Sequence, residues 1–509
     1  MKNKDIQLDV FIFRATGRTR TGDPRITNAL LYQLSHNGNA FVGIAKNECK
    51  STAFFGNMQI ILCICVFFCN FVGRMRKIIF ILAIGYWLSA ICNGSVCMAQ
   101  YQTCIYDTQV RTLRVQYLDE SSKLQRPILL LENGVIDGSD PKNTLEISFD
   151  ELSHDTRMYS YTLLHLNYDW TPSALNSYEY VKGYTTMDIY DYAMSVNTQQ
   201  VYTNYRFTFP NNDMQLIASG NYALLIYEDG DMQKLVAQAC FSVVESLTEI
   251  ELNQRGNTDI EFNGRYQQLD VDINTIHLNV RNPQDIKLIV CQNGRSDNMV
   301  EVQKPTFVEP NRLRYLNQKA LIFEGGNEFR HFDVYSVYYA GYHVDRMEYA
   351  QGEYHALLDM DEVRGTLGKG AGVEGIPYLT ENDVNGQWIV NCEKSDDVDI
   401  EAEYIWVHFL LPVKQPIMDG QVFVGGEMFG NQYGVQNRMM YDADHKCYYL
   451  YAYLKQGGYD YMYYVVGKNG VTTLPLEGSH WQTENEYTLL VYYRPFGARY
   501  DRLVGCKRI

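Results

Sequence analysis

The sequence has few of the residues that build metal, redox and catalytic centres. Its 509 residues include 10 histidines, with no tight ligand pair among them, and 12 cysteines without a CxxC spacing. Zinc and thioredoxin-like redox sites usually require such spacings. The chain also lacks a glycine-rich phosphate loop, an HExxH motif, an EF-hand loop and a nucleophile elbow. These absences predict a protein that is not an enzyme, with no catalytic residue, cofactor or metal ion.

Helix-length hydrophobic periodicity is also scarce, whereas aromatic residues make up 13% of the chain and include 41 tyrosines. Tyrosine and β-branched residues favour strands. Turn dipeptides that supply a positive φ recur between the strand-like runs. They are Asn133-Gly134, Asp137-Gly138, Asp229-Gly230, Asn293-Gly294, Gly457-Gly458 and Asn469-Gly470. We therefore expect an all-β protein made of tandem immunoglobulin-like β-sandwich domains.

Positive charge is scarce beyond residue 99. The first 99 residues hold 11 Lys and Arg against 4 Asp and Glu, and the remainder holds 33 against 56. An acidic body repels nucleic acid and anionic lipid headgroups. We expect no nucleic-acid partner and no direct membrane insertion.

Six cysteines lie beyond residue 99, without a recognisable pattern. They are Cys104, Cys240, Cys291, Cys392, Cys447 and Cys506. Occasional disulfides and buried free thiols both remain open, and buried thiols are favoured.

Met75 opens a segment with the three parts of a secretory signal peptide. Arg76 and Lys77 are basic, the run 78–91 is apolar, and small residues lead to Ala99 before Gln100. The apolar run is too short for a comfortable membrane span. We expect residues 75–99 to be a signal peptide, cleaved between Ala99 and Gln100, and the protein to be exported.

A signal peptide acts only at the start of a translated chain, so residues 1–74 need another explanation. The stretch "RTRTGDPRITNALLYQLS", residues 18–35, back-translates into codons whose reverse complement resembles the T and D arms of a transfer RNA gene. The two arms lie in the order and at the spacing of an antisense reading. We expect residues 1–74 to be a spurious extension from an over-extended gene start, not a basic nucleic-acid-binding arm.

Beyond the signal peptide, strand blocks and turns suggest three domains. The first block closes with two strands around a hairpin, and the second opens with the alternating Leu269, Val271 and Ile273. A glycine-rich stretch, "GTLGKGAGVEGIP", separates the second block from the last. The expected boundaries are 100–245, 246–364, 365–377 for the linker or loop, and 378–509.

Two tyrosine runs flank a Gln-Gly-Gly turn in the last block. They are Tyr449, Tyr451 and Tyr453 before the turn and Tyr459, Tyr461 and Tyr463 after it. Period two places each run on one face of a strand. We expect a hairpin whose tyrosines pair across a half-exposed sheet face, an interpretation favoured over a ligand platform.

Three further candidate functional sites are better explained by structural roles. His165 is expected to be a hydrogen-bonded sheet residue. His331 and Asp333 should share a strand face, but without a visible third ligand they suit a structural pair better than a metal site. The acidic segment 359–365 lacks the rest of a calcium loop and is expected to be a solvated turn.

One long segment carries a specific resemblance. It includes "LNYDWTPS", Tyr178-Glu179-Tyr180, "FPNN" and "SGNY", and it resembles the N-terminal domain of the type IX secretion system plug protein family of Bacteroidetes. The segments "FEGGNEFRHFDVYSV" and "EGSHWQTENEYTLLVYYRPFGARYDRLVG" are similar to the middle and C-terminal signatures of that family. The motif residues, expected to be structural with Trp170 anchoring its turn to the core, are Asn167, Asp169, Trp170, Pro172, Ser173, Glu179, Tyr180, Gly220, Asn221, Tyr222, Asn327, Glu328, Phe329, Arg330 and Asp333.

The resemblance implies a periplasmic, multidomain β protein that needs no cofactor. Its implied partner is the giant outer-membrane β-barrel translocon of the type IX system, whose periplasmic opening the plug reversibly occludes. A water-filled barrel leaks solutes unless a rigid body closes it. The alternative is a periplasmic or surface glycan-binding β-sandwich protein that uses its tyrosines as sugar platforms. A β-sandwich hydrolase is the least favoured class, because abundant carboxylates are no evidence of a catalytic pair.

Overall fold

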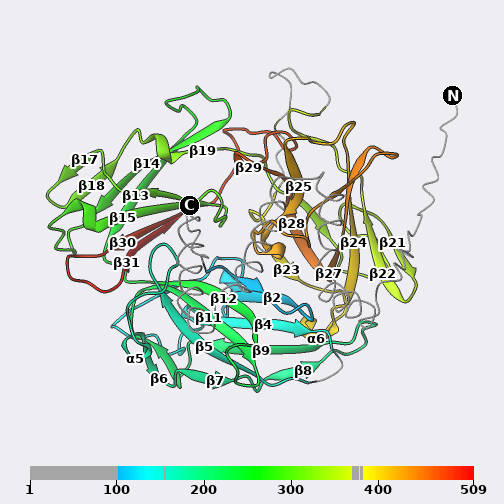
Figure 1. The fold of residues 1–509 in the computed structure, drawn as a ribbon, viewed down its shortest axis with the longest axis horizontal. Coiled ribbons are helices and arrows are strands. Elements are labelled where there is room, and N and C mark those ends of the chain that lie inside the picture. The colour runs from blue at the N-terminus through cyan, green and yellow to red at the C-terminus, as the bar shows by residue number, and fades with distance from the viewer. Residues whose placement is uncertain (1–100, 154–155, 369–377, 379–381) are drawn as a thin grey trace, which may run out of the picture. The chain divides into compact units, whose positions relative to one another are not determined.

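A computed structural model describes residues 101–153, 156–368, 378 and 382–509 (Figure 1). The predicted extension 1–74, the signal peptide 75–99 with its cleavage after Ala99, and most of the stretch 365–377 lie outside the described residues. The described part is nearly all β and folds into three β-sandwiches, so the predicted all-β sandwich class is confirmed.

The first sandwich contains two main sheets. One has the order β1 (Cys104–Ile105), β12 (Leu235–Val244), β11 (Gly220–Glu228), β5 (Tyr159–Leu166) and β7 (Thr186–Asp188), with β3 (Ile128–Leu130) parallel to β12. The other has the order β2 (Val110–Tyr117), β4 (Leu145–Glu151), β9 (Thr203–Phe209) and β8 (Tyr192–Met194). A small sheet pairs β10 (Met214–Leu216) with β6 (Val181–Gly183).

The core between these sheets is rich in aromatic rings. Phe149, Tyr159 and Tyr205 are buried, and their ring centroids lie 4.8–5.3 Å apart. Stacked and edge-to-face arrangements of this kind add to the gain from burial. Strands β11 and β12 form the predicted hairpin, whose turn residues Asp229 and Gly230 have φ values of 55° and 70°.

The middle sandwich uses strands that are distant in sequence. Its first sheet has the order β13 (Glu249–Arg255), β14 (Tyr266–Asn274), β18 (Arg312–Tyr315) and β17 (Phe307–Glu309), with β19 (Ile322–Glu324) also on β14. Its second sheet has the order β16 (Val300–Val302), β15 (Ile286–Gln292), β30 (Tyr487–Tyr493) and β31 (Arg502–Arg508). The predicted alternation in β14 is confirmed, because Leu269, Val271 and Ile273 are all buried.

The third sandwich also has two main layers. In one, β28 (Gly457–Gly467) pairs with β20 (Arg330–Asp333), β23 (Trp388–Val390), β25 (Gly420–Gly425) and β29 (Gly470–Thr472). The other, called here the outer sheet, has the order β21 (Val344–Ala350), β22 (Glu353–Leu358), β24 (Tyr404–Pro412), β27 (Cys447–Lys455) and β26 (Met440–Asp442).

Helices are short throughout the described residues. They are α5 (Ser177–Tyr180), α6 (Val398–Glu401) and the 3-10 turns η1 (Glu120–Ser122), η2 (Pro141–Asn143), η3 (Pro283–Asp285), η4 (Lys319–Leu321) and η5 (Glu427–Phe429). Within this described part, none is long and apolar enough to cross a membrane.

The expected boundaries at 364 and 378 do not separate the hydrophobic cores. Strand β30 pairs along its whole length with β15, so the last strands complete the middle sandwich, and the red β30 and β31 lie beside the green β15 in Figure 1. Conversely, β20, β21 and β22 belong to the third sandwich. The third sandwich is therefore inserted between β19 and β30. Local composition could not reveal this, because the pairing partners are about two hundred residues apart in sequence.

The predicted tyrosine hairpin is wrong. Strand β27 pairs with β24 and β26, whereas β28 lies in the other sheet, so the chain crosses the sandwich at Gln456 instead of reversing within one sheet. Tyr459, Tyr461 and Tyr463 are buried in the core. The earlier run, Tyr449, Tyr451 and Tyr453, faces outward beside β24. The two tyrosine runs consequently cannot pair with each other.

Candidate functional site

The first motif segment builds a tight turn after β5. The Asp169 carboxylate accepts hydrogen bonds from the backbone N–H and the hydroxyl of Thr171, and the Trp170 N–H donates to the Asn167 carbonyl. Trp170 has a φ of 60°, which places it in the left-handed region. Pro172 forms an isolated antiparallel β-bridge with Leu166.

Trp170 does not anchor this turn to the core of its own sandwich. It is half-buried and lines a cavity of about 290 Å³, together with residues of the other two sandwiches such as Met299 and Trp388. An indole side chain is large enough to fill space between separately folded layers. The prediction that Trp170 anchors its turn to the core is therefore wrong.

The rest of the first motif ties the turn to neighbouring strands. Ser173 N–H donates to the His165 carbonyl, the Tyr180 hydroxyl donates to the Leu163 carbonyl at 3.0 Å, and Glu179 forms a capping box with Asn176. Gly220 has a φ of 137°, and a Cβ there would lie 2.7 Å from His165 Nε2. This position therefore requires glycine.

Asn221 is the hub of the first motif. Its amide nitrogen donates to the Asn167 carbonyl at 3.0 Å, and its oxygen accepts from Ser242 and from the Tyr492 hydroxyl, both at 2.8 Å. Tyr492 belongs to β30, so this buried amide links the first sandwich to the middle one. Beside it, Tyr222 is buried and donates to the Ala218 carbonyl.

His165 is the hydrogen-bonded sheet residue that the sequence predicted. Its Nε2 lies 3.0 Å from the Ser219 carbonyl oxygen, and its ring contacts Tyr180, Tyr222 and Tyr500. Burial lowers the pKa of His165 to about 4. The ring is thus neutral at pH 7 and has a structural role.

The second motif centres on Arg330, which is buried inside the third sandwich. Its guanidinium contacts Asp361 at 2.6 Å and the Glu477 carboxylate at 2.8 and 3.0 Å. Tyr461 and Tyr463 donate their hydroxyls to Asp361 at 2.8 and 2.6 Å. Although burial opposes it, the Arg330 charge and the hydrogen bonds with His343 and Tyr463 lower the pKa of Asp361 to about 2.

Asp361 corrects the expectation for segment 359–365. The segment was expected to be a solvated turn, yet Asp361 is buried because it neutralises Arg330 and satisfies two buried hydroxyls. His331 and Asp333 do share a face of β20, as predicted, but they do not form a pair. His331 Nδ1 contacts Asp460 at 2.8 Å, and Asp333 accepts from the Tyr342 N–H.

The remaining motif residues hold the connection between the middle and third sandwiches. Asn327 donates to the Glu477 carbonyl at 2.9 Å. Glu328 accepts from Tyr378 and from the Glu484 N–H. Phe329 is buried, and its N–H donates to Asp383.

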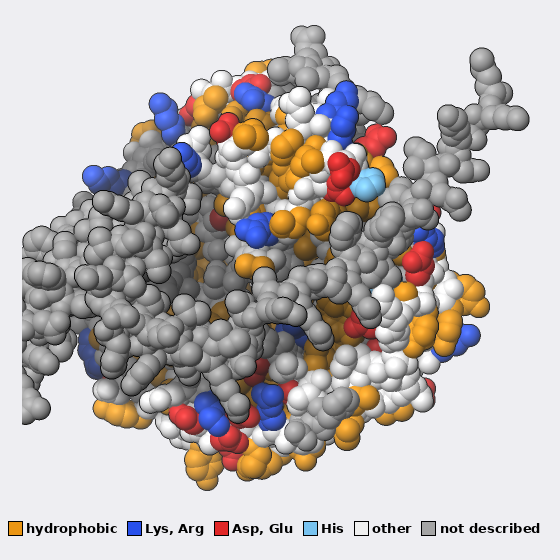
Figure 2. Space-filling view, turned by 45° about the vertical axis from the view of Figure 1, so that its right-hand side comes forward, with side chains coloured by type: hydrophobic (Ala, Val, Ile, Leu, Met, Phe, Trp, Pro, Cys, Tyr) orange, Lys and Arg blue, Asp and Glu red, His pale blue; other side chains and the backbone are white. Residues whose placement is uncertain are grey.

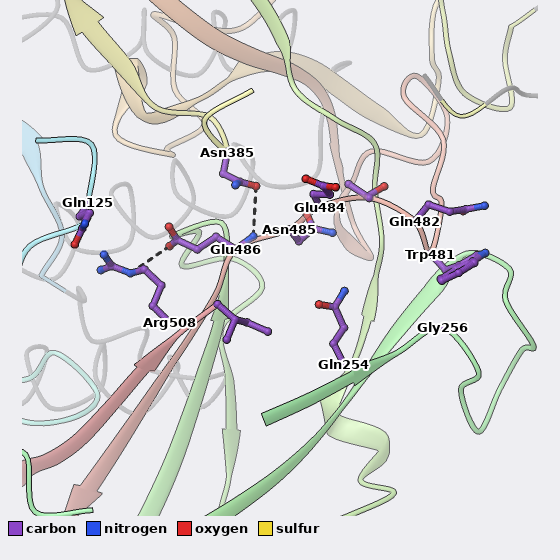
Figure 3. A pocket seen from close by; sticks show the side chains of 12 residues that line it. Gln125, Gln254, Gly256, Asn385, Trp481, Gln482, Glu484, Asn485, Glu486 and Arg508 are labelled. Carbon is purple, nitrogen blue, oxygen red and sulfur yellow. Dashed lines mark hydrogen bonds and ion pairs between the residues drawn. The ribbon is translucent and has the colours of Figure 1, made fainter. Parts of the chain in front are cut away.

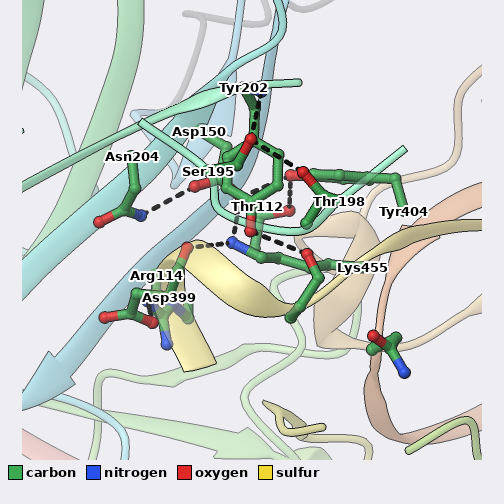
Figure 4. Close-up of polar contacts among 12 residues, drawn as sticks. Thr112, Arg114, Asp150, Ser195, Thr198, Tyr202, Asn204, Asp399, Tyr404 and Lys455 are labelled. Atoms are coloured by element: carbon green, nitrogen blue, oxygen red, sulfur yellow. Dashed lines mark hydrogen bonds and ion pairs between the residues drawn. The ribbon is translucent and has the colours of Figure 1, made fainter. Parts of the chain in front are cut away.

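A buried ion pair joins the first and third sandwiches (Figure 4). Lys455 Nζ on β27 lies 2.6 Å from Asp150 Oδ2 on β4, and both side chains are at most 1% exposed. The ammonium also donates to the Asp399 carbonyl at 2.7 Å and lies 4.2 Å from the centre of the Tyr202 ring. Burial lowers the pKa of Lys455, although Asp150 opposes this shift.

Further polar contacts surround this ion pair, and we call the whole set the Lys455 junction. Tyr404 donates to Asp150 at 2.7 Å and contacts the Thr112 hydroxyl at 2.5 Å, while Arg114 pairs with Asp399 at 2.5 Å. Thr112 has a φ of 55° at an irregularity of β2. A β-branched residue rarely adopts this conformation, so the strain is maintained by the surrounding contacts.

Arg126 connects all three sandwiches, in what we call the Arg126 junction. Its guanidinium contacts Glu486 of the middle sandwich at 2.5 Å and Glu427 of the third at 3.2 Å. It also donates to the backbone carbonyls of Asn293 and Asn385. These two carboxylates raise the pKa of Arg126 despite its burial. A single cation thereby contacts acidic groups from two different sandwiches.

A cavity of about 780 Å³ opens next to the Arg126 junction (Figure 3). Its lining is rich in amides, and Figure 3 shows Gln254 pointing from β13 toward the segment that carries Asn485. Arg508 lies 3.7 Å from Glu486, so that carboxylate is shared with Arg126. The lining residues, all in the described part of the chain, include no His, Cys, Ser or Lys.

The solvent side of the outer sheet forms an aromatic face. Ring contacts link Trp406 to Tyr453, His408 to Tyr451 and Tyr451 to Tyr449, with centroids 4.4–5.5 Å apart. Tyr451 is 52% exposed. Figure 2 shows hydrophobic side chains gathered in groups among charged and polar ones on one side of the molecule. Tyrosine is enriched at interfaces because it is large, fairly rigid and amphipathic.

Sequence reasoning missed Arg126, Asp150, Lys455 and Asp361. Each is an ordinary charged residue whose partners lie far away in sequence, for example 305 residues apart for Asp150 and Lys455. Asp361 lies in the acidic segment 359–365, and Lys455 lies between the two tyrosine runs.

Comparison with protein families finds a match for the first sandwich. Residues 110–245 match the type 9 secretion system plug protein 1st domain. A crystal structure of a hypothetical protein from Parabacteroides merdae is 35% identical and superposes with a TM-score of 0.74. The match covers 81% of this chain and 100% of that chain. No curated protein matches the chain.

Proposed function

The chain belongs to the type 9 secretion system plug protein family, and from this membership we propose that it is the periplasmic plug subunit of that system. In this role it reversibly occludes the periplasmic opening of the giant outer-membrane β-barrel translocon and performs no catalysis. The observation that carries the proposal is the family match over residues 110–245, which contain all strands of the first sandwich except β1. Family membership supports an association with type IX secretion. Occlusion of the translocon opening is our further proposal.

The domain junctions support an occluding role. A plug must keep its shape against solutes, and interfaces between domains normally permit relative motion. Here the Lys455 junction and the Arg126 junction bury ion pairs, and separating the sandwiches would remove Lys455 from Asp150 and Arg126 from Glu486. Such separation is strongly unfavourable. The sandwiches are therefore expected to behave as one rigid body.

Apolar packing strengthens the connection between the first and middle sandwiches. Val244, Ile289, Tyr492 and Leu503 form a separate buried cluster there. Glu245 also pairs with Arg502 at 2.5 Å. The link thus combines hydrophobic burial with ionic contacts.

Co-purification with the translocon tests the proposal. A tagged chain recovered from the envelope should bring down a large outer-membrane barrel. Arg126→Ala, which loosens the junction of all three sandwiches, should recover less barrel. Lys123→Ala is the matched control, because this cation lies on the same segment and, within the described residues, forms an ion pair only with the exposed Glu120. Recovery of the protein without any large barrel would overturn the proposal.

The aromatic face supports a second candidate, a glycan-binding protein. Tyr449, Tyr451 and Tyr453 lie on one side of a β-sandwich, with Tyr451 exposed and the other two half-buried, and aromatic rings on such a face can stack on sugars. Retention of the purified chain on a polysaccharide affinity gel, without a barrel partner in the envelope, would favour this alternative.

A further inference from the structure

Strand β13 is an open edge of the middle sandwich. Its seven residues pair with β14 in an uninterrupted register from Glu249 to Arg255. Among the described residues, no strand pairs with its other side. In an antiparallel pair, alternate residues point their backbone N–H and C=O groups away from the partner strand. On β13 these groups are available to bond another chain.

No other edge of the described sheets combines this length with this regularity. The other terminal strands have at most four residues, except β2, β21, β25 and β31. The pairing of β2, β21 and β31 is interrupted by irregularities. Strand β25 is covered, because its Val424 N–H donates to the Asn437 carbonyl. Short, irregular or covered edges resist the addition of a further strand, and β13 has none of these protections.

The open edge leads to the cavity of about 780 Å³. Just before β13, the Thr248 N–H donates to the Val504 carbonyl of β31 at 3.1 Å. At the far end of the two strands, Gln254 of β13 and Arg508 of β31 both line the cavity, and Figure 3 shows their side chains on different strands around it. The two sheets of the sandwich therefore touch at one end of this edge and leave a cavity between them at the other.

The exposed face beside this edge is acidic. Glu249 and Glu251 are exposed and alternate with apolar residues that pack on the core. The cation of the strand, Arg255, is held by Asp270 at 3.0 Å. Glu251 contacts Arg312 at 3.3 Å in an exposed pair, which contributes little. An added strand with cations on this face would have carboxylates as its cross-strand neighbours.

We propose that β13 binds an extended segment of another protein that carries Lys or Arg at alternate positions. The segment adds to the sheet as a further strand and is held by main-chain hydrogen bonds. Its cations lie beside Glu249 and Glu251, and the side chain opposite Gln254 points toward the cavity, whose amides can hydrogen-bond it. The site does not depend on the proposed plug function.

Fluorescence anisotropy with a labelled peptide tests the site. The probe is an amidated eight-residue peptide that alternates Lys with Val, and the purified chain should bind it. N-methylation of the Lys amides alone, or of the Val amides alone, removes the donors from one edge of the extended peptide. One of these two peptides should bind about tenfold more weakly than the other, because only one edge meets β13. Equal affinities would overturn the proposal.

Charge reversal locates the bound peptide. Glu251→Lys should weaken binding of the Lys-Val peptide roughly three- to tenfold and strengthen binding of the corresponding Glu-Val peptide. Glu309→Lys is the matched control, because Glu309 is exposed on β17, at the opposite edge of the same sheet, and should leave both affinities unchanged. Equal responses of the two variants would indicate general attraction to an acidic protein and would contradict binding at β13.

Hydrogen exchange on the unmodified chain needs no variant to fold. The Lys-Val peptide should slow exchange in residues 249–255 and leave residues 307–309 of β17 unchanged. Protection only outside β13 would refute the site. So would a dimer of this chain that occupies β13 and does not dissociate when the peptide is added.

Discussion

Arg126 shows how much one side chain contributes to stability when it is buried between domains. It contacts Glu486 and Glu427, which belong to two different sandwiches. Exposed pairs contribute little, because water screens them. A buried pair that loses one partner leaves a charge without compensation, which costs about 3–5 kcal/mol.

Arg126→Ala should therefore lower the free energy of unfolding by up to about 3–5 kcal/mol, since Arg508 still compensates part of the Glu486 charge. Chemical denaturation followed by fluorescence measures this change. Lys123→Ala serves as the control and should cost less than about 1 kcal/mol, because its partner Glu120 is exposed. Equal effects of the two substitutions would contradict the role given to Arg126.

His165 predicts a pH dependence of stability. Its pKa in the folded protein is about 4, below the ordinary value of 6.5, so the unfolded chain binds the proton more tightly. The stabilising effect of the neutral ring is fully present above pH 6.5 and is lost as the pH falls from 6.5 toward 4. The loss amounts to up to about 3 kcal/mol.

His165→Gln keeps a donor for the Ser219 carbonyl but removes the titration. Denaturation between pH 7 and pH 4 should show a smaller decline for this variant than for the unmodified chain. Some decline should remain, because burial lowers the pKa of His408 to about 4 as well. Parallel pH profiles would show that His165 does not titrate as described.

At the scale of elements, two turn glycines differ in whether their turn contacts the Arg126 junction. Gly230 in the β11–β12 turn and Gly294 in the β15–β16 turn have φ values of 70° and 64°. A Cβ at Gly230 would meet nothing within 4 Å, whereas at Gly294 it would lie 1.9 Å from Arg126 Nε. The two positions share backbone strain and differ in contact with the Arg126 junction.

Gly230→Ala should cost about 1 kcal/mol, from the positive φ alone. Gly294→Ala should cost clearly more, because it also displaces Arg126. Hydrogen exchange should show additional loss of protection around Glu427 and Glu486 only in Gly294→Ala. If both variants lose the same stability and protection, the hairpin does not support the junction.

Elements with local signals could be predicted from the sequence. The β11–β12 hairpin has Asp229-Gly230 between its strands, and β14 alternates Leu269, Val271 and Ile273 with polar residues. The crossing from β27 to β28 could not be predicted, because a Gly-rich turn fits both a hairpin and a passage between sheets. Partners such as β15 and β30 are chosen by the whole core, which no local pattern encodes.

The site could be predicted only in part, for the same physical reason. The motif residues Asn221 and Arg330 were singled out, yet their partners Tyr492 and Asp361 come from other segments. Asp361 was expected in solvent because its neighbours are acidic. Its burial depends on a cation that lies 31 residues away in sequence.

At the scale of the whole molecule, the insertion of the third sandwich into the middle one gives two chain connections between them. The first and third sandwiches have no direct connection of this kind and are held by the Lys455 junction. Three sandwiches joined in this way provide the rigid body that occlusion of a wide pore requires. The plug function therefore requires that this rigid body closes the barrel as well as binding to it.

Conductance of the purified translocon in a planar lipid bilayer measures closure directly. Addition of this protein on the periplasmic side should reduce the ionic current through an idle barrel, and removal of the protein should restore it. Arg126→Ala should reduce the current less than Lys123→Ala does. A stable complex whose barrel conducts as freely as the barrel alone would contradict the plug function.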